Sequence, residues 1–189
     1  MARTKNNVLN SFFCICMCFA LLLTAGSSVF AAGRKEFPKR IKAFGAWAVY
    51  GYNVGGKRVC YALSAPISKS PSKVDHGKVY FLISRRPSKR STARDLLEPQ
   101  FLAGYTLKHD SSVLASVISH HKEGKSFNLF TNGKCGWLRL IDQEVAIIHD
   151  MSKGAVLKVK AVSARGTKTT YNFSLSGLGN ALKYVRECK

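Results

Sequence analysis

The segment AVLKVKAVSARGTKTTYNFSL, residues 155–175, constrains the fold more than any other stretch of the chain. Apolar and polar residues alternate on both sides of the turn ARGTK, which is the period of a strand with one buried face. The inward set is Leu157, Val159, Ala161, Tyr171, Phe173 and Leu175. The pattern predicts an antiparallel hairpin, and the rest of the chain must cover its apolar face.

Six other segments have the composition of strands and are separated by turn signals such as VGGK (54–57), HHKEG (120–124) and NGK (132–134). They are Ala43–Tyr52, Arg58–Ala65, Lys78–Arg85, Phe101–Leu107, Ser112–Ser119 and Lys125–Thr131. In the first of them, Trp47 and Val49 share a face. The total of about eight strands predicts a mainly β protein: a single-domain antiparallel β-sandwich or partly closed β-barrel with two short helices, one of them C-terminal.

The first helix is expected over Gln143–Gly154, with Val145, Ile148 and Met151 on its apolar face. The second follows from the helical spacing of Leu178, Ala181, Leu182 and Val185. Ser174 or Ser176 is the candidate N-cap of this second helix.

The N-terminus has the order of an export signal: Arg3 and Lys5, then the apolar run SFFCICMCFALLLTA, then small residues before Ala32. The alternative is an uncleaved membrane anchor. We expect cleavage, with a signal peptide at 1–31, a basic flexible lead-in at 32–42 and one β domain at 43–189. Removing residues 1–31 of the 189 leaves 158 and lowers the formal net charge from +20 to +18.

Three cysteines remain in the expected mature chain, and an exported protein meets oxidising conditions. Spacing alone allows Cys60–Cys188, Cys60–Cys135 or Cys135–Cys188.

The positive charge is the feature furthest from ordinary composition. It predicts an anion-binding surface whose partners are an anionic envelope lipid or glycan, or a host-cell surface component, and it allows peripheral membrane association. Nucleic acid is not expected outside the cytoplasm. The alternative is that these cations only keep the protein soluble. The candidate residues are Arg85, Arg86, Lys89, Arg90, Arg94, Lys158, Lys160, Arg165 and Lys168.

No catalytic, cofactor or metal motif is expected. A G-x-S-x-G elbow and a complete phosphate loop are both missing, and SPSK (70–73) lies in a proline-containing loop without its partner motifs. His120 and His121 are neighbours in a turn without a third ligand at suitable spacing. Trp47 and Trp137 are expected in the core. The sequence therefore predicts a protein that is not an enzyme.

In chain order, the segments FGAWAVYGY, RVCYALSAP, VYFLISRRP, FNLFTNGKCGWL and RGTKTTYNFSLSG resemble the invasion-associated locus B proteins of Gram-negative bacteria. The resemblance runs from Trp47 to Cys188. It implies an exported envelope protein, periplasmic or outer-membrane-associated, surface-exposed or secreted, that assists invasion of host cells such as erythrocytes without enzymatic activity. The alternative is a periplasmic factor for envelope integrity that docks to the outer membrane.

The resemblance also bears on the cysteines, because family members commonly keep one at the position of Cys60 and one at that of Cys188. It implies a Cys60–Cys188 disulfide. Cys135, where a small residue is usual, is then expected to be reduced and buried.

Overall fold

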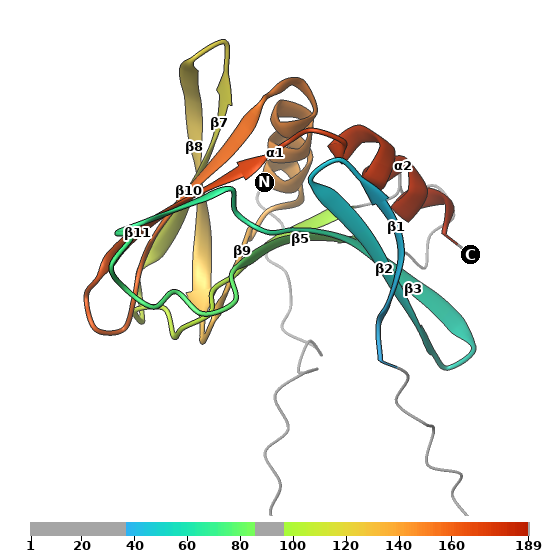
Figure 1. Cartoon of the computed structure of the whole chain (residues 1–189), viewed down its shortest axis with the longest axis horizontal. Coiled ribbons are helices and arrows are strands. Elements are labelled where there is room, and N and C mark those ends of the chain that lie inside the picture. Colours follow the sequence, from blue (N-terminus) through green and yellow to red (C-terminus); the bar gives the residue numbers. More distant parts are fainter. Residues whose placement is uncertain (1–36, 86–96, 189) are drawn as a thin grey trace, which may run out of the picture. The chain divides into compact units, whose positions relative to one another are not determined.

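The computed structural model describes residues 37–85 and 97–188, all within the second of two compact units, Arg34–Lys189. All strands of this part of the chain join one antiparallel sheet in the order β1-β2-β3-β5-β6-β9-β8-β7-β10-β11-β4 (Figure 1). The strands are β1 (Lys39–Phe44), β2 (Trp47–Val54), β3 (Lys57–Ser64), β4 (Ser68–Ser70), β5 (Tyr80–Arg85), β6 (Leu97–Leu102), β7 (Ser112–Ser119), β8 (Lys122–Asn132), β9 (Cys135–Trp137), β10 (Val156–Val162) and β11 (Lys168–Ser174). The helices are α1 (Ile141–Lys153) and α2 (Leu178–Glu187).

The sheet bends back so that β5 and β6 face β11 across the core. The rings of Phe81 and Phe173 lie 5.8 Å apart, and those of Phe101 and Tyr171 lie 5.6 Å apart. Trp47 is 1% exposed, and its Nε1 donates a hydrogen bond of 3.0 Å to the carbonyl of Ser174. The halves of one sheet thus form the two layers of a sandwich-like, open β fold. This confirms the predicted fold class, without closure into a barrel.

The hairpin of β10 and β11 is confirmed, and its register runs without a break from the Val156–Ser174 pair to the Val162–Lys168 pair. All six of its predicted inward residues are buried. Because facing residues of an antiparallel pair point to the same side of the sheet, this register also fixes which side chains point outward.

The predicted first strand is two strands, because the chain turns at Gly45 and Ala46. Gly45 has a φ of 56°, and the Ala46 amide donates to the Ser176 carbonyl at 3.0 Å. The new edge strand, β1, begins at Lys39 and pairs with β2. Residues 39–42 therefore belong to the sheet, which corrects the prediction that they are part of a flexible lead-in.

The strand predicted at Phe101–Leu107 lies earlier in the chain, as β6. On the β6 side, β9 pairs only with Gln100–Leu102. Pro99 has no N–H to donate and lies just before these paired residues. After Leu102 the chain leaves the sheet, and a Cβ on Gly104 would collide with the backbone of His76–Lys78. The short strands β4 and β9 were not predicted either, since three residues carry too little alternation to be recognised.

Both helices form, but the buried face of α1 differs from the prediction. Glu144, Ile147 and Met151 are buried, whereas Val145 is 57% exposed. The apolar face follows the i, i+4 pair Ile147 and Met151, and not the spacing of three that starts at Val145. Within the described part of the chain, neither helix is long and apolar enough to cross a membrane.

Helix α2 buries its predicted face, which consists of Leu178, Ala181, Leu182 and Val185. Neither serine caps it. The N-cap is Gly177, at a φ of 86°, and a Cβ there would collide with the Phe44 carbonyl. Glycine is therefore required where β11 passes into α2, because β1 lies against this turn.

The disulfide between Cys60 and Cys188 is present, with the two Cα atoms 6.2 Å apart and a sequence separation of 128. It joins the buried face of β3 to the C-cap of α2. The pairing implied by the family resemblance is thus confirmed. Cys135 is free, but it is half-buried, which corrects the expectation that it is buried.

We predict that replacing both Cys60 and Cys188 with alanine lowers the free energy of unfolding by roughly 4–5 kcal/mol, because the reduced chain regains the entropy of a very long loop. Urea denaturation of the oxidised protein and the double variant measures this. Cys135→Ala is the matched control and should change stability far less. Equal urea midpoints for the double variant and the control would contradict the structural role of the bond.

Candidate binding surface

Three of the predicted anion-binding residues share the outward face of the β10–β11 hairpin. Lys158 and Lys160 alternate with buried Val159, and Lys168 faces Val162 across the hairpin. Lys160 and Lys168 are exposed, and Lys158 is partly covered. The strand pattern places the three ammonium groups on one side of the sheet because the inward positions are taken by the core.

Within the described residues, one carboxylate, that of Glu123, forms ion pairs with two of these lysines. Glu123 Oε2 accepts a 2.7 Å hydrogen bond from Lys158 Nζ, and its Oε1 lies 3.8 Å from Lys160 Nζ. The hydrogen bonds from Lys158 and Ser116 hold the pKa of Glu123 below its ordinary value. The Glu123 side chain is 34% exposed, so water screens the pair and its net contribution to stability is small. Lys160 and Lys168 keep most of their capacity for an external anion.

Of the other predicted cations, Arg85 lies away from these three lysines, beside the last turn of α2. Arg86, Lys89, Arg90 and Arg94 lie outside the described residues. Arg85 ends β5, and its Nη1 donates a 2.9 Å hydrogen bond to the Arg186 carbonyl in the last turn of α2. Arg85 therefore supports the C-terminus of α2.

Arg165 is exposed in the β10–β11 turn and borders a pocket of about 280 Å³. His76, Tyr105 and Thr169 are among its lining residues, and the hydroxyl of buried Tyr171 connects them in a series of hydrogen bonds. The Tyr171 hydroxyl lies 2.8 Å from His76 Nδ1 and 3.0 Å from the Tyr105 hydroxyl, which lies 2.6 Å from Thr169 Oγ1. Burial raises the pKa of Tyr171, so its hydroxyl stays protonated. These hydrogen bonds connect the core strand β11 to the loop that carries His76.

The outward face continues from the hairpin onto β7 and β8. Lys160 faces Leu114, which in turn faces Asn128. One step along the strands, Ser112 faces Phe130, and Phe130 faces Trp137 of β9. Trp137 is half-buried on this outer face, which corrects its assignment to the core; Trp47 is buried as predicted.

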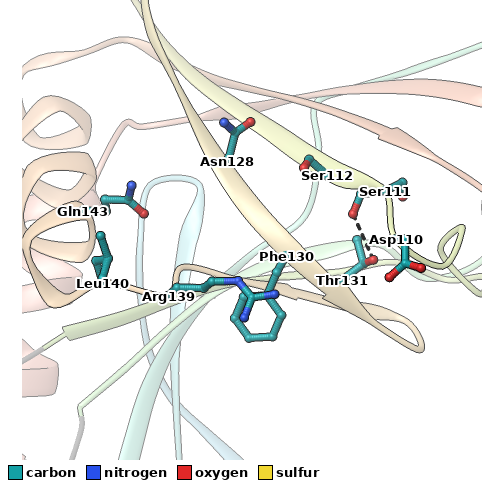
Figure 2. Close-up of a pocket in the computed structure, with 9 residues that line it drawn as sticks. All are labelled: Asp110, Ser111, Ser112, Asn128, Phe130, Thr131, Arg139, Leu140 and Gln143. Atoms are coloured by element: carbon teal, nitrogen blue, oxygen red, sulfur yellow. Dashed lines mark hydrogen bonds between the residues drawn. The ribbon is translucent and has the colours of Figure 1, made fainter. Parts of the chain in front are cut away.

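A pocket of about 480 Å³ opens where this face meets the first turn of α1 (Figure 2). The Arg139 guanidinium lies 4.4 Å from the centre of the Phe130 ring, and the Trp137 ring lies 5.5 Å from the same ring. The nine lining residues are Asp110, Ser111, Ser112, Asn128, Phe130, Thr131, Arg139, Leu140 and Gln143. The sequence gives no sign of this site, because its residues come from three separate stretches, 110–112, 128–131 and 139–143, that only the fold brings together.

Neither metal nor thiol chemistry is indicated in the described part of the chain. Residues 37–85 and 97–188 contain no cluster of three histidine, cysteine or acidic side chains that could hold a metal ion. Burial raises the pKa of the Cys135 thiol, so this side chain stays in its less reactive protonated form.

These observations define a class: a small, disulfide-linked protein with one folded-over antiparallel sheet and a basic outer face. No protein-family model and no curated protein sequence matches the chain. Among solved structures, the crystal structure of invasion associated protein B from Bartonella henselae matches it with a TM-score of 0.55 at 15% sequence identity. The match covers 77% of this chain and 94% of that chain. The likeness to the invasion-associated proteins is thereby confirmed for the fold.

We predict that Tyr171→Phe destabilises the protein by about 1–3 kcal/mol, because it leaves buried His76 Nδ1 and the Tyr105 hydroxyl without their shared partner. Tyr184→Phe is the matched control, since no other described residue hydrogen-bonds to the Tyr184 hydroxyl. Thermal or urea unfolding of both variants measures the difference. Equal stability of Tyr171→Phe and Tyr184→Phe would show that the hydrogen bonds of the Tyr171 hydroxyl do not stabilise the fold.

Proposed function

We propose that this protein is an exported, non-enzymatic envelope protein that binds an anionic cell-surface component and thereby assists attachment to, or invasion of, host cells. The observation that carries the proposal is the outer face of the hairpin, where Lys158, Lys160 and Lys168 lie on one side and Glu123 is their nearest counter-charge. The disulfide supports export, because such bonds persist in oxidising compartments. The name of the Bartonella protein that shares this fold, invasion associated protein B, supports a role in invasion.

The physical basis of the proposed binding is electrostatic attraction at short range. Exposed ammonium groups on a rigid sheet attract phosphate, sulfate or carboxylate groups within about 8 Å at physiological salt. A rigid scaffold also loses little conformational entropy when it binds. Binding of this kind requires no catalytic group. The proposed partner of the protein is a surface and not a substrate.

We predict that replacing Lys158, Lys160 and Lys168 together with glutamine weakens binding to immobilised heparin roughly tenfold or more at low salt, since each lysine near an anionic surface contributes about 1 kcal/mol. Glu123→Gln should have the opposite effect and strengthen retention, because it releases Lys158 and Lys160. Elution salt concentration measures both changes.

The matched control for this test removes the same charge from exposed positions on β1, β3 and α2: Lys42, Lys57 and Lys183 to glutamine. If the control weakened heparin binding as much as the hairpin variant, net charge alone would explain retention and the proposed face would be wrong. Retention of the unmodified protein that did not change with salt would also contradict the electrostatic basis.

We further expect the mature chain to begin near Ala32 and to lie at the cell surface. Protease treatment of intact cells, followed by mass spectrometry, should then digest the protein and show no peptide from residues 1–31. Full protection in intact cells and digestion only after the outer membrane is opened would favour the periplasmic envelope-integrity role instead. A protein that retains Met1 in the cytoplasm would contradict export.

A further inference from the structure

The pocket beside α1 contains polar side chains that the protein itself leaves without partners. Among the described residues, no side chain or backbone group hydrogen-bonds to the Arg139 guanidinium, the Asn128 amide, the Gln143 amide or the Ser112 hydroxyl. Figure 2 shows these groups around a common space, with Leu140 beside Gln143 and Asp110 on the far side. Together they offer donors and acceptors that only a ligand or water can satisfy.

Arg139 is the organised element of this pocket. Its planar guanidinium lies 4.4 Å from the centre of the Phe130 ring, and Phe130 in turn contacts Trp137. Stacking on an aromatic ring restricts the long arginine side chain and leaves its N–H edge available. An exposed guanidinium held in this way is suited to a carboxylate, which it can bind with two parallel hydrogen bonds.

The rest of the lining is suited to a ligand with many hydroxyl groups. The amides of Asn128 and Gln143 can each donate and accept, and the Ser112 hydroxyl can do the same. The Asp110 carboxylate can accept hydrogen bonds from hydroxyls, and its own partner in the fold is the equally exposed His109, at 2.8 Å. Leu140, which is 57% exposed, offers an apolar contact for the C–H groups of a ring.

We propose that this pocket binds a carboxylated sugar, with the carboxylate on Arg139 and the hydroxyls on Asn128, Gln143 and Asp110. A neutral sugar would leave Arg139 without a counter-charge, and a bare phosphate, which accepts but donates little, would leave the amide oxygens and the Asp110 carboxylate without donors. A sugar that carries both groups satisfies the whole lining. The volume of about 480 Å³ accommodates one such ring.

The position of the pocket extends the proposed function, on which this inference rests. Asn128 and Lys160 both face Leu114 on the intervening strand, so they lie two strand spacings, or about 10 Å, apart on one face. An acidic polysaccharide with one sugar in the pocket would therefore pass over Lys160 toward Lys168. The pocket selects the carboxylated sugar, and the lysines add attraction that does not depend on its identity.

The test measures dissociation constants by calorimetry for two pairs of probes. The first pair is 3′-sialyllactose and lactose, and the second is a hyaluronan tetrasaccharide and chitotetraose. We expect at least one carboxylated probe to bind tenfold or more tightly than its neutral partner. Preference for the first pair identifies sialic acid as the carboxylated sugar, and preference for the second identifies a uronic acid. Equal affinities within both pairs would overturn the inference.

The variant Arg139→Gln should lose this preference by tenfold or more, since a charge-assisted hydrogen bond is replaced by a neutral one. Arg58→Gln removes the same charge from an exposed position on β3 and is the matched control. Thermal unfolding checks that both variants are folded. The Arg58→Gln control should retain the preference. If Arg139→Gln retained it as well, the assignment of the carboxylate to Arg139 would be overturned.

The two proposals can fail separately. Heparin binding that falls with the three hairpin lysines, while Arg139→Gln leaves every sugar affinity unchanged, would refute the pocket and support the basic face. The opposite result is sugar selectivity that depends on Arg139 and heparin binding that is unchanged when the three hairpin lysines are replaced. It would support the pocket and refute the basic face.

Discussion

Packing of the sheet against itself is the constraint on which the rest of the molecule depends. Phe81 and Phe101 contact Phe173 and Tyr171 from the opposite layer, and Trp47 hydrogen-bonds to the end of β11. This arrangement commits one face of β2, β5, β6, β10 and β11 to the core. At the roughly 25 cal/mol per Å² of buried apolar surface, these aromatic side chains are among the largest favourable contributions to folding. The opposite face is therefore the one available for binding, and it carries the hairpin lysines and the Phe130, Trp137 and Arg139 cluster.

The disulfide and the hydrogen bonds of Tyr171 hold parts of the fold that contribute least to this aromatic packing. Helix α2 ends one residue before Cys188, and a short C-terminal helix frays unless it is attached. The bond to Cys60 attaches it to β3, and Arg85 binds the carbonyl of Arg186 in its last turn. In the middle of β11, the hydroxyl of Tyr171, with that of Tyr105, connects the sheet to the loop of His76. Both devices restrain segments that packing alone holds least firmly.

The sequence predicts well where local pattern and packing agree, as in the β10–β11 hairpin and the buried face of α2. It predicts poorly where distant segments decide the outcome. Gly45 ends β1 because Ser176 lies against it, Trp137 is on the outer face because β9 pairs with β8 there, and the chain leaves β6 because Gly104 meets the backbone near His76. The pocket at Arg139 is the extreme case, since no local signal connects Asp110, Asn128 and Gln143. The disulfide pairing was available only from the family resemblance, because the spacing of the cysteines allows three pairings.

The central claim is that the protein functions through the outer face of β8, β7, β10 and β11. The most direct measurement is a two-dimensional ¹H–¹⁵N NMR titration of the mature protein with an acidic oligosaccharide that carries the preferred carboxylated sugar and is long enough to span that face. The account predicts shifts of the amide signals of Asn128, Arg139, Lys160 and Lys168, with the signals of α2 and β3 unchanged. Shifts confined to any other surface, or a spectrum that does not respond while the protein still binds cells, would contradict it.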